Sequence, residues 1–185
     1  MFKKLLFVLL LISSFVSAKE ADTLTFNLKT IDGKTLEVQG TKNGLVFKEF
    51  QNKIVLLEFW GTHCPPCLMS IPHYIDLTKK YKDKVAIVAI EVQMTPKTQL
   101  AEFVKAKGIN YNVLAQRENM DFVRYVATRA QWRGAIPYLL IFGKNGEVVT
   151  IQRGMVSEEY IENVIKQLDK PQATTQKESN TTAQK

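Results

Sequence analysis

The sequence predicts an α/β protein with a mixed central sheet flanked by helices. Two continuous apolar runs, residues 54–60 and 85–92, have the length and character of buried strands, and a helical pattern separates them. Asp-Gly and Asn-Gly pairs at residues 32–33 and 145–146 predict tight turns between antiparallel strands. Strands that alternate with helices in this order favour one sheet with helices on both faces.

The N-terminal part of the domain has the pattern of a β-hairpin. Apolar and polar residues alternate over residues 23–28, and the alternation continues through residues 36–38 after the Asp-Gly turn. The apolar residues at 45–50 predict a short helix or turn before the first buried strand.

A helix is expected over residues 64–81, directly after the first buried strand. Pro72 lies inside it and should kink it, because proline has no N–H and its ring clashes with the preceding turn. The apolar residues of this helix are Met69, Ile71, Tyr74, Ile75 and Leu77.

The part of the chain after the second buried strand predicts a helix, a short strand and a second helix. Thr95 is placed as the N-cap and Pro96 as the first residue of the first helix, which ends near Gly108. Residues 111–114 are a strand candidate, and the spacing of apolar residues predicts a helix over 120–127.

The last elements are an antiparallel pair and a helix. Residues 138–142 and 148–151 flank the Asn-Gly turn, and Ser157 can cap a helix that ends before Pro171. Residues 171–185 are polar with almost nothing apolar, which predicts a disordered tail.

The first residues have the pattern of an export signal. Lys3 and Lys4 precede the apolar run 5–12, and small residues stand at 16–18 where signal peptidase cleaves. We expect a cleaved signal peptide over residues 1–18, a domain over 19–170, and a periplasmic or extracytoplasmic location. The alternative is an uncleaved N-terminal membrane anchor, although the apolar core is short for a membrane span.

The charge of the chain is a modest positive excess. The net charge is +7, and +5 once residues 1–18 are removed. The basic residues are scattered and do not alternate with aromatic ones, so a solvated surface is favoured over a nucleic-acid partner.

The two cysteines of the chain, Cys64 and Cys67, are three positions apart at the expected start of a helix. Free N–H groups and the helix dipole at such a place stabilise a thiolate, and Pro65 and Pro66 stiffen the turn between the sulfurs. A structural disulfide is the alternative, but a bridge over so short a loop removes little entropy from the unfolded chain. The spacing therefore favours a redox-active pair.

Several residues around this pair share their spacing with a known family. Glu58 lies six residues before Cys64, Trp60 follows it, and Pro72 lies five residues after Cys67. Residues 133–142 are similar to a cis-proline loop and its strand, followed by a hairpin and Arg153-Gly154.

Over residues 24–168 the chain resembles the thioredoxin-like superfamily, and within it the exported TlpA/ResA/CcmG-type thiol–disulfide oxidoreductases. The resemblance implies a thioredoxin fold with an N-terminal β-hairpin and an insertion before the cis-proline strand. It also implies that Cys64 attacks the partner's disulfide and Cys67 resolves the mixed disulfide; the reverse order is the alternative.

Glu58 is a charged residue in an apolar strand. Burial without a partner raises the pKa of a carboxyl, and one poised near neutral pH can take the proton of Cys67. The alternatives are a pair with a lysine or a position at a solvent-exposed strand edge.

The resemblance implies that a cis bond precedes Pro137 and that the backbone of Ile136 pairs with an extended substrate. An ordinary trans proline at a strand start is the alternative. Trp60 is expected to be a packing residue that shapes the rim of the substrate site.

His63 and Tyr138 depart from the family pattern. A cationic His63 beside Cys64 would stabilise the thiolate, together with Pro65 and Pro66, but His63 could equally be a solvent-exposed bystander. Tyr138 stands where many members have threonine, which puts partner specificity in doubt.

The resemblance therefore predicts an enzyme that exchanges disulfides with protein substrates, which in the family include apocytochromes c. It favours the reductase direction with a membrane thiol donor, whereas a disulfide-introducing oxidase uses the same residues. A Cu(I)-binding chaperone is a third hypothesis, because thiolates suit Cu(I), but Cys64 and Cys67 supply only two ligands. We expect no metal and no cofactor other than the redox-active disulfide.

Overall fold

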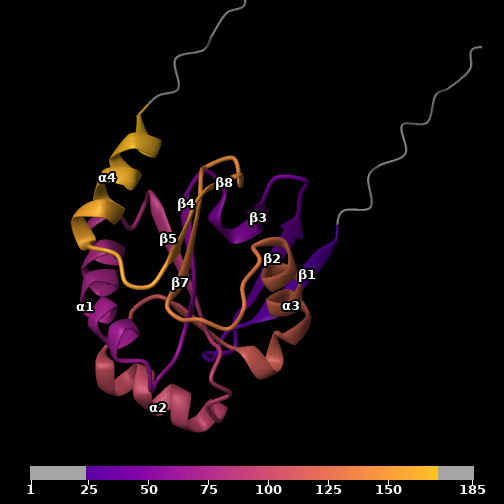
Figure 1. Ribbon diagram of the computed structural model, residues 1–185, viewed down its shortest axis with the longest axis vertical. Coiled ribbons are helices and arrows are strands. Elements are labelled where there is room, and N and C mark those ends of the chain that lie inside the picture. The colour runs from indigo at the N-terminus through magenta and orange to yellow at the C-terminus, as the bar shows by residue number, and fades with distance from the viewer. Residues whose placement is uncertain (1–23, 171–185) are drawn as a thin grey trace, which may run out of the picture.

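The structure, a computed structural model, describes residues 24–170. Its centre is a five-stranded mixed sheet in the order β6-β5-β4-β7-β8 (Figure 1). The strands of this sheet are β4 (Ile54–Trp60), β5 (Val85–Glu91), β6 (Asn112–Ala115), β7 (Tyr138–Phe142) and β8 (Val148–Arg153). This arrangement confirms the α/β class and the mixed sheet.

Strands β4 and β5 form the buried middle of the sheet, and every residue of both is buried. They run parallel, so Trp60 at the end of β4 lies opposite Glu91 at the end of β5. Strand β7 is antiparallel to β4 and places Tyr138 opposite Phe59. One edge of the sheet therefore gathers the end of β4, the end of β5 and the start of β7.

Helices cover both faces of this sheet (Figure 1). Helices α1 (Pro65–Lys80) and α4 (Glu158–Asp169) pack on one face through a shared apolar cluster. Helix α3 (Met120–Arg129) lies on the other face, together with the N-terminal strands. Helix α2 (Lys97–Lys107) packs through Leu100 beside the start of α1.

The N-terminal strands form a separate three-stranded antiparallel sheet. Its strands are β1 (Thr25–Lys29), β2 (Thr35–Gly40) and β3 (Leu45–Phe47). The expected hairpin is confirmed, but the short helix or turn expected over residues 45–50 is correct only for the 3₁₀ turn Lys48–Phe50. Leu45 and Phe47 are buried on alternate positions against β2, which makes them a strand.

Two details of the helices differ from the expectation. Helix α2 begins at Lys97 with Pro96 as its N-cap residue, and the hydroxyl of Thr95 bonds Glu91 instead of capping the helix. Met69, one of the apolar residues of this helix, is 60% exposed, because the buried stripe of α1 runs through other residues. That stripe consists of Cys67, Ser70, Ile71, Tyr74 and Leu77. Ser157 caps α4 as expected, since its side chain accepts a hydrogen bond from the Tyr160 N–H.

The signal peptide expected over residues 1–18 and the tail expected over 171–185 lie outside the described residues. Within residues 24–170, none of the helices has both the length and the apolar character needed to cross a membrane.

Candidate active site

The two cysteines form a disulfide at the start of α1. Cys64 is the N-cap residue and has an extended backbone, while Pro65 and Pro66 occupy the first helical positions. Cys64 is 6% exposed and Cys67 is 1% exposed, so Cys64 is the more accessible of the two cysteines. Among the described residues, no group of three or more His, Cys, Asp or Glu side chains is arranged to hold a metal ion.

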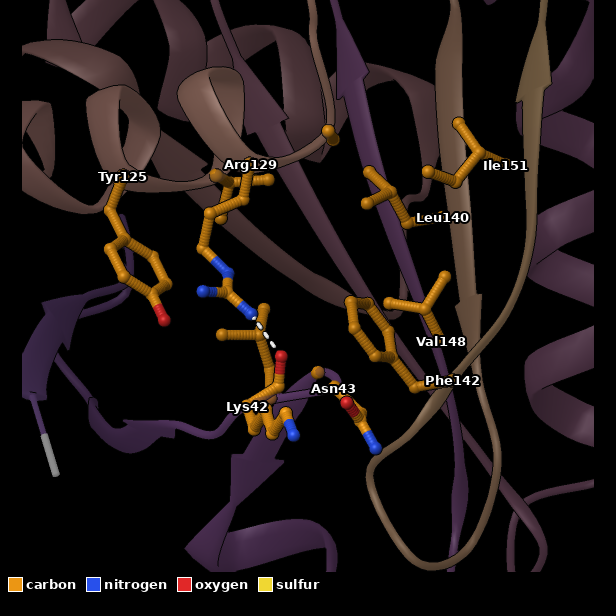
Figure 2. Close-up of a pocket in the computed structure, with 12 residues that line it drawn as sticks. Lys42, Asn43, Tyr125, Arg129, Leu140, Phe142, Val148 and Ile151 are labelled. Carbon is orange, nitrogen blue, oxygen red and sulfur yellow. Dashed lines mark hydrogen bonds between the residues drawn. The ribbon is translucent and has the colours of Figure 1, made fainter. Parts of the chain in front are cut away.

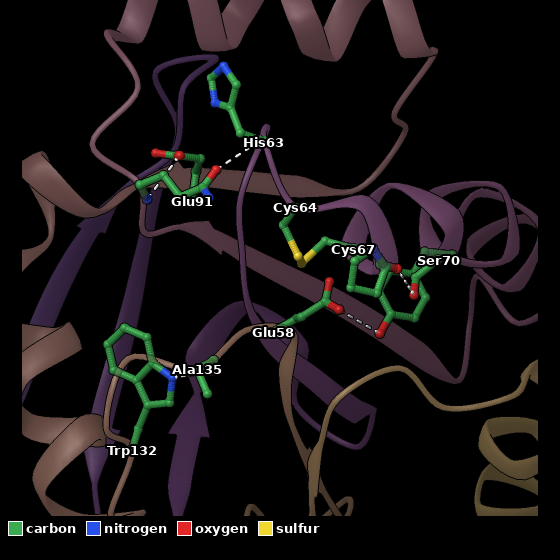
Figure 3. The surroundings of a disulfide bond; sticks show 11 residues. Glu58, His63, Cys64, Cys67, Ser70, Glu91, Trp132 and Ala135 are labelled. Carbon is green, nitrogen blue, oxygen red and sulfur yellow. Dashed lines mark hydrogen bonds between the residues drawn. A yellow bond between two sulfur atoms is a disulfide. The ribbon is translucent and has the colours of Figure 1, made fainter.

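Glu58 lies in the middle of β4 and is only 3% exposed. Its side chain points toward the two cysteines (Figure 3). The carboxyl accepts a hydrogen bond of 3.1 Å from the Tyr74 hydroxyl. Burial raises the pKa of Glu58 from 4.5 to about 8, and the Tyr74 hydrogen bond lowers it by less. Burial also contradicts the alternative of a solvent-exposed strand edge, and the partner found is a tyrosine and not a lysine.

The peptide bond between Ile136 and Pro137 is cis. Ile136 packs against the apolar cluster that contains both cysteines, and Pro137 is buried. A hydrogen bond within the chain stabilises the segment before Pro137: the indole N–H of Trp132 donates a 2.7 Å hydrogen bond to the Ala135 carbonyl (Figure 3). The cis-proline loop and the disulfide are thus neighbours, although they are far apart in the chain.

Trp60 does not contribute to the rim of the site. It is 2% exposed and packs against Phe103 at 5.8 Å between ring centroids, so a protein substrate has no access to it. Its placement among substrate-binding residues at the rim is therefore corrected, while its expected packing role agrees with its burial. Its indole N–H is buried and has no hydrogen-bond partner in the described part of the chain. Tyr138 is buried as well, and its hydroxyl donates to the Ala130 carbonyl.

His63 is exposed, and its ring is turned away from the disulfide (Figure 3). Its backbone N–H donates a 2.8 Å hydrogen bond to the side-chain oxygen of Gln93, and its Nδ1 lies 3.0 Å from the Thr62 hydroxyl. The Gln93 contact connects the segment before Cys64 to the loop after β5, whereas the Thr62 contact lies within that segment.

Glu91 is a residue of this site that sequence reasoning missed. It ends the apolar run of β5, which predicts only a buried strand, yet its carboxylate is fully buried (0% exposed). The carboxyl accepts hydrogen bonds from the N–H groups of Gln93 and Thr95 and from the Thr95 hydroxyl. The signal for it is an acidic residue at the carboxyl end of β5, the strand parallel to β4, which precedes the cysteines.

A separate cavity of about 350 Å³ lies between the β2–β3 turn, α3 and the β7–β8 pair (Figure 2). Its apolar floor includes Leu140 and Phe142, and Arg129 at its edge donates hydrogen bonds to the Lys42 and Thr41 carbonyls. Phe142 pairs with Val55 at the start of β4, whereas the disulfide follows the end of that strand. The cavity is therefore remote from the disulfide.

A family model described as the AhpC/TSA family matches residues 23–151. The thiol-disulfide oxidoreductase ResA of Halalkalibacterium halodurans is 26% identical over 151 residues, covering 81% of this chain and 76% of the relative. The ResA of Bacillus subtilis is 28% identical over 156 residues, covering 84% of this chain and 78% of the relative.

Two solved structures show the same fold. A putative thioredoxin from Neisseria meningitidis superposes with a TM-score of 0.61 at 22% identity, covering 79% of this chain and 88% of the other. StoA from Bacillus subtilis superposes with a TM-score of 0.57 at 17% identity, covering 76% and 95%. At these identities the likeness shows the thioredoxin fold alone.

Proposed function

Because the chain belongs to the AhpC/TSA family and has the thioredoxin fold, we propose that it is an extracytoplasmic thiol–disulfide oxidoreductase. It exchanges disulfides with protein substrates through Cys64 and Cys67, and the cysteine pair itself is the redox centre without a bound cofactor. The relatives named thiol-disulfide oxidoreductase support the activity. The export pattern of residues 1–18 supports the location.

The observation that carries this proposal is the pairing of a disulfide at a helix start with a buried carboxyl directed toward it. In the reduced protein, the Cys64 thiolate attacks a substrate disulfide, a Cys64–substrate bond forms, and the leaving sulfur takes up a proton. Glu58 then takes the proton of Cys67, whose thiolate attacks the Cys64 sulfur and breaks the Cys64–substrate bond. The second substrate sulfur leaves as a thiolate and takes a proton from solvent. The substrate gains two electrons and the cysteine pair loses them.

A pKa of about 8 suits Glu58 to this step, because the group can hold and release a proton near neutral pH. In the disulfide form of the protein, the carboxyl is mostly protonated at pH 7. In the reverse direction it can therefore return the proton to Cys67 when the disulfide is reduced.

The Ile136 backbone next to the cis Pro137 bond is the proposed contact for an extended segment of the substrate. Its position in the apolar cluster of the cysteines supports this role. Trp60 is excluded from it by its burial.

We propose the reductase direction, with proteins such as apocytochromes c as substrates and a membrane thiol donor that reduces the Cys64–Cys67 disulfide again. The resemblance to TlpA/ResA/CcmG-type proteins supports this direction. The disulfide-introducing direction uses the same residues, and the relative stability of dithiol and disulfide decides between them.

Two experiments test the proposal. A Cys67→Ala variant should accumulate mixed disulfides with substrate proteins through Cys64. The matched control is a separate Cys64→Ala variant, prepared in the same way, which should trap none. Failure of Cys67→Ala to trap any protein contradicts the exchange mechanism.

The second experiment measures the reduction potential of the Cys64–Cys67 pair. A value of about −270 mV supports the reductase direction, and a value of about −120 mV supports the oxidase direction.

A further inference from the structure

A chain of hydrogen bonds connects the buried Glu91 to the exposed His63. The Thr95 hydroxyl lies 2.8 Å from Glu91 Oε1, the Thr62 hydroxyl lies 2.9 Å from that of Thr95, and His63 Nδ1 lies 3.0 Å from the Thr62 hydroxyl. Thr62 and His63 lie in the loop after β4, and Thr95 lies in the loop after Glu91, the last residue of β5. The parallel register of Trp60 and Glu91 places both loops at the same sheet edge.

The chain of hydrogen bonds has a defined direction of donation. A carboxylate only accepts, and each threonine hydroxyl has a single hydrogen to donate. Thr95 donates its hydrogen to Glu91, so it must accept the hydrogen of Thr62. The Thr62 oxygen can then only accept from His63, which requires a proton on Nδ1 of the imidazole.

Two more contacts keep the loops in this arrangement. The other donors to the Glu91 carboxyl are the N–H groups of Gln93 and Thr95, each at 3.0 Å, so all its described partners donate. The Gln93 side chain accepts the His63 N–H and packs closely on Gly61, where an added Cβ would lie 2.2 Å from Gln93 Cδ. A side chain at position 61 would therefore displace the Gln93 side chain from this contact.

We propose that Glu91 is a positioning residue that holds the proton of neutral His63 on Nδ1, through Thr95 and Thr62. This leaves Nε2 with its lone pair outward as a hydrogen-bond acceptor. His63 is exposed next to Cys64 in the chain and its ring is turned away from the disulfide (Figure 3), so the target we assign to Nε2 is a molecule that binds at Cys64 and not the Cys64 sulfur itself. The group that it recognises is a donor, either a backbone N–H or a thiol of the substrate protein.

This proposal rests on the proposed function only where it names a substrate protein as the molecule that Nε2 recognises. The tautomer of His63 can be observed directly, whatever the substrate is. The test is ¹⁵N NMR of the histidine side chains at a pH where the imidazoles are neutral, since the two tautomers give different patterns of nitrogen–proton couplings. The chain has two histidines, and a His73→Gln variant assigns the signals. The wild-type protein should show His63 as the Nδ1–H tautomer; an Nε2–H pattern overturns the proposal.

Substitutions at Thr95 and Glu91 test whether the hydrogen bonds from Glu91 set the tautomer of His63. Thr95→Val removes the middle hydroxyl, so Thr62 can turn its hydrogen to Nδ1, and the signal of His63 should invert to the Nε2–H pattern. Thr95→Ser keeps the hydroxyl and should keep the Nδ1–H pattern. Glu91→Gln puts an NH₂ group among three donors and should also lose the wild-type pattern. Identical spectra for the wild type, Thr95→Val and Glu91→Gln overturn the proposal.

Thr128→Val is the matched control, because Thr128 lies on the exposed side of α3 and its hydroxyl bonds the Arg124 carbonyl. It should leave the His63 signal unchanged. If the wild type shows the Nδ1–H tautomer but Cys67→Ala traps no substrate, the proposed function fails and the role of Glu91 stands. If Cys67→Ala traps substrates but His63 is the Nε2–H tautomer, the proposed function stands and the role of Glu91 fails.

Discussion

Replacement of Glu58 by glutamine should change how the stability of the protein depends on pH. In the folded protein the pKa of Glu58 is about 8, against 4.5 for an ordinary glutamate. This difference corresponds to about 5 kcal/mol, at roughly 1.4 kcal/mol for each tenfold change in proton affinity. It is a large part of the stability of a typical domain, which is roughly 5–15 kcal/mol.

The sign follows from which state holds the proton. Between pH 4.5 and about 8 the folded protein keeps the Glu58 proton and the unfolded chain releases it. The free energy of unfolding therefore has its full Glu58 contribution below pH 4.5 and loses it as the pH rises through about 8. At pH 7 the loss should already be about 3 kcal/mol. Glu58→Gln cannot titrate and should lack this loss.

The assay is urea unfolding of the oxidised protein at a series of pH values, since disulfide-bonded cysteines do not titrate. The free energy of unfolding of Glu58→Gln, minus that of the wild type, should rise by about 5 kcal/mol between pH 4.5 and a pH above 8. Glu159→Gln, which changes an exposed carboxyl, should follow the wild type. A difference between Glu58→Gln and the wild type that stays constant with pH would refute the reasoning.

Substitutions at four further sites should change the stability of the protein by predictable amounts or shift its pH dependence. Tyr74→Phe removes the hydrogen bond that lowers the pKa of Glu58, so the pH at which stability stops falling should move upward in the same titration. Gly33→Ala meets no atom within 4 Å but has a φ of +89°, and it should cost about 1 kcal/mol. Gly146→Ala has a φ of +80° and places a Cβ 2.5 Å from a backbone oxygen, so chemical denaturation should show a loss of about 3 kcal/mol. Trp60→Phe removes a buried unpaired N–H and should cost no more than about 1.5 kcal/mol, whereas Trp60→Ala should cost about 3–5 kcal/mol; equal losses for the two would contradict the role of Trp60 as a packing residue.

Local patterns in the sequence are enough to predict the elements that carry the cysteines. The buried strand before Cys64 is a continuous apolar run, and the helix after it begins with two prolines, which suit the first turn of a helix. Both signals depend on neighbours in the chain and so need no knowledge of the fold. The same holds for the Ser157 cap, whose side chain bonds a residue three positions later.

Predictions fail where a residue's conformation depends on a contact outside its own helix or strand. Residues 45–47 form a strand because β2 pairs with them, and Thr95 leaves the helix because the Glu91 carboxyl takes its hydroxyl hydrogen. Trp60 lies in the core and not at the rim because Phe103 of α2, more than 40 residues later in the chain, packs against it.

The chemistry of the site divides in the same way. The disulfide-bonded pair can be predicted from local sequence, because Cys64 and Cys67 are three positions apart at the start of one helix. The positions of the protons depend on tertiary structure: the depth of burial sets the pKa of Glu58, and the parallel alignment of β4 with β5 brings Glu91 to the loop of His63. Desolvation and hydrogen bonding depend on which groups surround a side chain in space, and local sequence does not contain that information.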